Sequence, residues 1–144
     1  MVRTLEFRNN GIIDSLTGAM APALFYENLQ REISAADRDR RTLSIISIVV
    51  VRRKLGEGEE LDAPLSERII KITSLIDHGM RADEYFSRIS EDGFWVLIRG
   101  TKENALMAIK RAELDPDIRI EVVEREEGES FRSWVSRVDR VHFA

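Results

Sequence analysis

The hydrophobic residues of this chain recur at two spacings, and these spacings predict where its helices and strands lie. Proline suits the first turn of a helix, so Pro22 and Pro64 are each expected to open one. After each proline in the sequence, apolar residues follow three or four positions apart, which places them on one side of a helix. The first stripe consists of Phe25, Leu29, Ile33 and Ala36, and the second of Leu65, Ile69, Ile72 and Ile76.

Three further segments are typical of strands. Residues 43–51 are almost wholly apolar and rich in β-branched side chains, as expected for a central strand covered on both faces. Residues 84–89 and 94–98 are short strands joined by Ser90-Glu91-Asp92-Gly93. Asp-Gly between apolar runs favours a tight turn, because both residues tolerate positive φ. The sequence therefore predicts a β-hairpin at this point.

The rest of the chain completes an alternating order. A third helix is expected over about residues 102–113, followed by a strand that alternates through Ile118, Ile120 and Val122. A last helix carries a stripe of Phe131, Trp134, Val135 and Val138. From Leu43 to Val123 the order is β-α-β-β-α-β, which is the ferredoxin-like arrangement. We therefore expect an α/β (α+β) fold with a central, mostly antiparallel sheet flanked by helices, an architecture that does not by itself choose a function.

Composition narrows the class of protein. The 144 residues suit one domain, 1–144, in which residues 1–13 form an N-terminal lead-in. A net charge of −4 and mainly aliphatic strands argue against nucleic-acid binding, including the RNA binding that some ferredoxin-like sheets perform. The absence of cysteine excludes disulfides, thiolate metal sites and thiol nucleophiles. With no signal-peptide-like run and no stretch near ~18 apolar residues, a cytoplasmic protein without membrane insertion is expected.

Several conspicuous residues have ordinary structural explanations. The basic run at residues 52–54 is followed by acidic residues, so a solvated loop is the simplest interpretation. His78 and His142 lack metal-ligand spacing, which favours surface or packing roles. Trp95 and Trp134 lie on apolar stripes and are expected in the core. Asp92-Gly93 is explained by the turn alone, so the hairpin needs support from elsewhere in the chain before it indicates a function.

That support comes from the order of several motifs. Residues 81–97 resemble the segment of GGDEF-family diguanylate cyclases in which Arg-x-x-Asp and a lone arginine precede Gly-Gly-Asp/Glu-Glu-Phe. Residues 14–18, with Phe25 seven positions beyond Gly18, resemble the family's opening Asp-x-Leu-Thr-Gly and its phenylalanine. Lys54 fits the lysine after the first core strand, and residues 129–140 resemble the last helix. The resemblance covers about residues 14–140; the chain ends before the family's closing segment, which favours a trimmed or reduced domain.

The resemblance also implies what has changed. Active members join two GTP molecules into cyclic di-GMP with two cations held by carboxylates. The two metal carboxylates correspond to Val49 and Asp92, of which only Asp92 is an acid. The signature corresponds to Ser90, Glu91, Asp92, Gly93 and Phe94, so both glycines and the motif's glutamate are replaced. The guanine-contacting positions fall about at Glu57 and Ser66, which do not match either. We therefore expect a degenerate domain with no cyclase activity, no metal and no cofactor.

Three functions remain open. The favoured one is a regulatory or protein-interaction domain in bacterial cyclic di-GMP signalling, whose partner is another protein or a second copy of the chain. A second is a cyclic di-GMP receptor, because Arg81-x-x-Glu84, with Asp83 beside it, approximates the family's inhibitory Arg-x-x-Asp site. The third is an active diguanylate cyclase with an atypical motif, which would need a different metal site.

Overall fold

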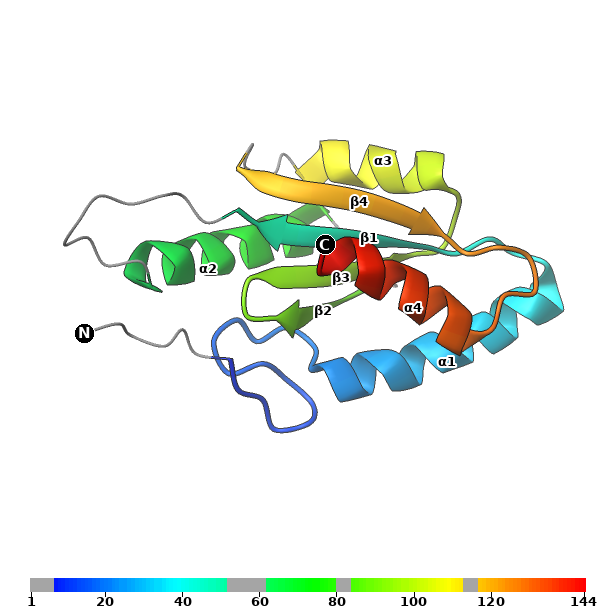
Figure 1. The fold of residues 1–144 in the computed structure, drawn as a ribbon, viewed down its shortest axis with the longest axis horizontal. Helices are drawn as coiled ribbons and strands as arrows, with labels where there is room; N and C mark the ends of the chain where they lie inside the picture. Colours follow the sequence, from blue (N-terminus) through cyan, green and yellow to red (C-terminus); the bar gives the residue numbers. More distant parts are fainter. Residues whose placement is uncertain (1–6, 52–61, 80–83, 113–116) are drawn as a thin grey trace.

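The computed structural model describes residues 7–51, 62–79, 84–112 and 117–144. Four helices and four strands alternate along this part of the chain (Figure 1). Their order is α1 (Pro22–Asp39), β1 (Ser44–Val50), α2 (Asp62–Gly79), β2 (Tyr85–Ser90), β3 (Gly93–Ile98), α3 (Lys102–Ala112), β4 (Ile118–Glu124) and α4 (Phe131–His142). The predicted β-α-β-β-α-β core, with one helix before it and one after it, is confirmed.

The four strands form one sheet in the order β2-β3-β1-β4. Every neighbouring pair is antiparallel, and β1 lies between β3 and β4. In the register, Ser47 of β1 faces Trp95 on one side and Glu121 on the other. The predicted antiparallel sheet with residues 43–51 at its centre is therefore confirmed.

Two hydrophobic cores lie on opposite faces of this sheet. Side chains alternate along β1, so Ile46 and Ile48 face α2 and α3, whereas Ile45 faces α1 and α4. The predicted helical stripes supply the other half of each core. Trp95 and Trp134 are both fully buried in the core beneath α1 and α4, as the sequence predicts. The domain thus has three layers, helices on each side of a sheet (Figure 1).

Helix boundaries follow the expected chemistry with one difference. Helix α1 begins at Pro22 as predicted and ends at Asp39; it is capped by Arg40, whose φ of 55° is the left-handed conformation of a helix cap. Helix α2 begins at Asp62, two residues before Pro64. The proline still lies in the first turn, where its missing N–H would have had no partner in the helix. Within these described ranges no helix is long and apolar enough to cross a membrane.

The outer edges of the two edge strands, β2 and β4, have different neighbours. Residues 7–20, which include the described part of the lead-in (7–13), form only isolated bridges, and one of these joins Met20 to Ser87 in parallel. The Ser87 hydroxyl also donates to the Met20 carbonyl at 2.6 Å. The N-terminal segment therefore covers part of the free edge of β2. Across the sheet, β4 pairs with β1 and with no other strand of the described chain.

Candidate functional site

The hairpin at residues 90–93 is fastened to the end of the central strand. Ser90 pairs with Gly93, Glu91 and Asp92 form the turn, and the Val50 amide donates to the Asp92 carbonyl at 2.8 Å. The predicted hairpin is confirmed, but the reason given for its glycine is wrong. Gly93 is not among the described residues with positive φ and is the first residue of β3.

The glycine is needed for space instead. A Cβ added at Gly93 would lie 2.4 Å from Cε1 and 2.6 Å from Nε2 of His142, closer than non-bonded carbon atoms approach. His142 stands at the end of α4, and its side chain is almost fully buried against the hairpin. The ring of one element therefore occupies the place that a side chain on the other would fill.

Two serines hold this imidazole from both sides. Nδ1 of His142 is hydrogen-bonded to Ser47 Oγ at 2.7 Å, and Nε2 to Ser90 Oγ at 2.8 Å. The Ser90 hydroxyl donates its one proton to Asp92 Oδ1 at 3.2 Å, so Nε2–H must be the donor to Ser90. Nδ1 then accepts from Ser47. The sequence analysis predicted none of these contacts. The one available signal was that His142 lies four residues after Val138, on the apolar stripe of α4.

The electrostatics keep this histidine neutral. The pKa of His142 is lowered to about 4, mainly by burial; Asp92 opposes the shift and the nearby Arg119 adds to it. At neutral pH the ring is therefore an uncharged hydrogen-bonding group. It cannot neutralise an anion, and both ring nitrogens are occupied by serines. The arrangement locks the hairpin to α4 and leaves no imidazole nitrogen for proton transfer.

The two-cation centre that the resemblance implies does not fit these residues. Val49 stands opposite Gly93 in the sheet, so two of the positions around the hairpin supply no oxygen ligand. The hairpin and β1 together contain two side-chain carboxylates, those of Glu91 and Asp92. Divalent cations of this kind are held by several hard oxygen ligands. Among the residues that the structure describes, no group of three or more His, Asp or Glu could hold a metal ion.

On its other side the hairpin is tied to the N-terminal segment. Arg88 and Asp14 form a fully buried ion pair with Nη1 to Oδ1 at 3.2 Å. Arg88 Nη2 also donates to the Glu91 carbonyl at 2.7 Å, which anchors the turn. Asp14 Oδ2 accepts from the amide of Thr17 at 2.9 Å and from its hydroxyl at 2.7 Å. Asp14 and Arg88 belong to two motifs 74 residues apart in the sequence, and the fold brings these two residues into contact.

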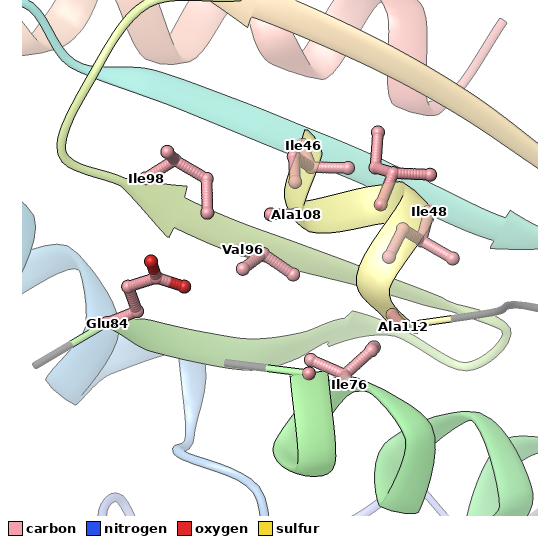
Figure 2. A pocket seen from close by; sticks show the side chains of 10 residues that line it. Ile46, Ile48, Ile76, Glu84, Val96, Ile98, Ala108 and Ala112 are labelled. Carbon is pink, nitrogen blue, oxygen red and sulfur yellow. The ribbon is translucent and has the colours of Figure 1, made fainter. Parts of the chain in front are cut away.

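Of the three candidate cyclic di-GMP residues, Glu84 lies within the described part of the chain. Arg81 and Asp83 fall outside the described residues, as do Lys54 and Glu57. Glu84 precedes β2, at the opposite end of that strand from Ser90. Its carboxylate lines a small, mainly apolar pocket beneath the sheet, and Figure 2 shows it among Val96, Ile98 and Ala108. One carboxylate oxygen, Oε2, is buried there.

A wider hollow, of about 410 Å³, lies between the N-terminal segment and α2. Its lining combines hydroxyl and carboxylate side chains with apolar ones, and includes Thr17, Met20, Thr73, Ser74, Asp77 and Phe86. Neither Glu84 nor any residue of the 90–94 signature lines it. The sequence interpretation missed this hollow; the one signal was Ile70, a half-exposed apolar residue of α2 outside the predicted stripe.

Comparisons with known proteins identify the fold. No protein-family model matches the chain, and no curated protein matches it. Among solved structures, the GGDEF domain of DgcB from Caulobacter crescentus, in complex with c-di-GMP, superposes with a TM-score of 0.76 and 16% identity, covering 94% of this chain and 90% of that one. The GGDEF domain of PA1120 (TpbB or YfiN) from Pseudomonas aeruginosa gives 0.74 and 19%, covering 91% and 86%.

A third similar structure is the diguanylate cyclase SiaD in complex with its activator SiaC, from Pseudomonas aeruginosa, with a TM-score of 0.75 and 17% identity. The match covers 91% of this chain and 56% of that chain. The chain therefore has the fold of GGDEF domains, as the motif order predicts. At these identities the likeness is one of fold.

Proposed function

We propose that this chain is a GGDEF-like domain that makes no cyclic di-GMP and instead acts as a regulatory or protein-interaction domain in cyclic di-GMP signalling. The observation that carries the proposal is the occupied end of the hairpin. Val49 faces Gly93 where the family places a metal carboxylate, and the ring of His142 lies against Gly93. Residues that would bind cations and phosphates are replaced there by hydrocarbon and a neutral imidazole.

The chemistry of phosphoryl transfer explains why this replacement matters for catalysis. The reaction depends on positioning and on cations that neutralise the triphosphate. Glu91 adds a carboxylate to the turn where the family has glycine, and like charges beside an anionic ligand raise the cost of binding. Ser47, His142 and Ser90 are joined by hydrogen bonds, so the polar groups of these three side chains are already engaged with one another.

The retained parts support an interaction role. The ion pair of Arg88 with Asp14 and the full sheet preserve the shape of the domain. A structurally similar protein, SiaD, is solved in complex with an activator protein. A domain of this shape can therefore contribute a docking surface without contributing catalysis.

The direct test is incubation of the purified protein with GTP and Mg²⁺ or Mn²⁺, followed by chromatography for cyclic di-GMP. We expect no product under conditions in which an active diguanylate cyclase consumes its GTP. Asp92→Asn is the matched control, because it removes the one acid left at the two metal positions that the resemblance implies, without changing the size of the side chain. Product made by the wild type would overturn the proposal. Its loss in Asp92→Asn would place the activity at the hairpin, whereas product unchanged by the substitution would point to a metal site that does not use Asp92.

The cyclic di-GMP receptor is the alternative that a second experiment separates. The buried Oε2 of Glu84 favours the interaction domain, because an acid that recognises a ligand should face solvent. Calorimetric titration with cyclic di-GMP decides between them. Micromolar binding that Arg81→Ala abolishes, and that the exposed Arg38→Ala on α1 leaves intact, would establish a receptor instead.

A further inference from the structure

The outer edge of β4 presents a row of backbone groups with which no strand of the described chain pairs. The Val51 amide donates to the Asp117 carbonyl at 3.1 Å and the Arg125 amide to the Leu43 carbonyl at 2.8 Å. Hydrogen bonding alternates along an antiparallel ladder, so the odd-numbered residues of β4 bond to β1. The amides and carbonyls of Ile118, Ile120 and Val122 therefore point away from the sheet. No strand of the described chain pairs with them.

The side chains on this edge are self-complementary. Arg119 and Glu121 lie on one face of the strand, two residues apart, and Ile118, Ile120 and Val122 alternate with them on the other. If two β4 strands pair antiparallel with Ile120 opposite Ile120, each Arg119 stands opposite a Glu121 of the other strand. Ile118 then stands opposite Val122. Both faces of the new ladder are matched.

We propose that the outer edge of β4 pairs with the same edge of a second copy of this chain, antiparallel, about a twofold axis at Ile120. The two sheets then form one continuous sheet of eight strands, with an isologous interface. The inference goes beyond the proposed function and does not depend on it. The hairpin lies on the other side of β1, at β2 and β3, so the pairing is compatible with either catalytic state.

The charges select one register among the neighbouring ones. Moving the axis by one residue to Glu121 brings two glutamates opposite each other, and moving it to Arg119 brings two arginines together. Directly opposed like charges destabilise a strand pair. Charges on an edge strand ordinarily discourage pairing. Here their spacing discourages the shifted registers and favours the one centred on Ile120.

Arg119 can take part without losing its contacts inside the chain. Its Nη1 donates to the Ala144 carbonyl at 2.9 Å and its Nη2 to the His142 carbonyl at 2.6 Å. A guanidinium has five N–H donors, so three remain for a carboxylate. Glu121 is exposed. The interstrand pair therefore adds a contact and displaces none.

The layer of helices also suits this pairing. Helix α3 lies over both β4 and β1, so its axis stands about one strand spacing, roughly 5 Å, from the proposed twofold. Two α3 helices would then lie about 10 Å apart, the usual distance between packed helices. Helix α2 approaches α3 at Ala112, where a Cβ added at Gly79 would come within 3.0 Å.

The flank of α3 away from α2 carries an exposed apolar residue. Leu106 lies about 120° around the helix from Ala112, at 100° per residue. Its exposed fraction is 49%. The second α3 would cover this flank, which adds apolar burial to the backbone hydrogen bonds.

The test uses two charge variants and their mixture. An interface built on one strand pair and one helix pair is small, so we expect a weak dimer that sedimentation equilibrium detects at protein concentrations up to about 1 mM. Glu121→Arg should weaken it about tenfold or more, because both interstrand ion pairs become repulsive. Arg119→Glu should do the same. Mixed together, the two variants restore both pairs, and the heterodimer should form more tightly than either homodimer.

A matched control and a second measurement keep the outcome clear. Glu27→Arg makes the same charge change at an exposed site on α1 and should leave association unchanged. Amide hydrogen exchange should slow with concentration at Ile118, Ile120 and Val122, a readout that needs no variant if Arg119→Glu fails to fold. A monomer at about 1 mM, unchanged association in Glu121→Arg, or a mixture no tighter than its components would each overturn the proposal.

Discussion

The same hairpin is held on two sides by contacts of opposite character. On the side of the N-terminal segment, Arg88 and Asp14 form a buried ion pair, and Arg88 also donates a hydrogen bond to the Glu91 carbonyl in the turn. Toward the C-terminus, neutral His142 joins Ser47 and Ser90. A buried charge left without its partner costs about 3–5 kcal/mol, whereas a buried neutral group left without its hydrogen bond costs about 1–3 kcal/mol. The two sides of the hairpin should therefore differ in how much stability a single substitution removes.

The largest expected effect comes from breaking the charged side. Arg88→Met leaves Asp14 buried without its cation and should lower the free energy of unfolding by about 3–5 kcal/mol. Urea denaturation followed by circular dichroism measures it. The control is Arg31→Met on α1, whose ion pair with Glu27 spans 3.6 Å and is well exposed, so the cost there should stay below about 0.5 kcal/mol. Equal costs for the two variants would contradict the contrast.

The pH dependence of stability tests the His142 side of the hairpin. The pKa of His142 is lowered from 6.5 to about 4 by burial, so the unfolded chain takes up a proton before the folded one does. Stability should be full above pH 6.5 and fall as the pH drops from 6.5 toward 4, by about 3 kcal/mol at most. Denaturation midpoints measured across this range report the loss.

Two histidine variants test the origin of that slope. His142→Gln should flatten the dependence between pH 6.5 and 4, because the titrating group is gone. His78→Gln, at an exposed position of α2, should leave it unchanged. A slope that survives His142→Gln would assign the acid sensitivity to another group.

The smallest effect tests the close approach at the hairpin. Gly93→Ala places a methyl group 2.4 Å from the His142 ring and should destabilise the fold by about 1–3 kcal/mol. In a His142→Ala background the same change should cost much less, because the space is then open. Thermal unfolding of the four proteins gives the coupling between the two sites. Strictly additive costs would mean that the ring and the glycine do not compete for space.

Most of the fold could be predicted because its signals are local. The Pro22 start of α1, the all-apolar β1 and the alternation in β4 each reflect the period of a helix or strand. The start of α2 was misplaced by two residues, because a proline is accepted at several positions of a first turn. The candidate site was predicted only in part. The hairpin was found, but its glycine was explained by φ when the cause is a ring from the far end of the chain.

The sequence by itself determined the elements, their order and the residues at the hairpin, since periodicity and turn chemistry depend on neighbours in the chain. Only the tertiary structure decided that Asp14 meets Arg88, that His142 covers Gly93, and that Met20 bridges one edge of the sheet while no strand of the described chain pairs with the other. These contacts join residues tens of positions apart. No local pattern encodes them, because they depend on how the helices and strands pack in space.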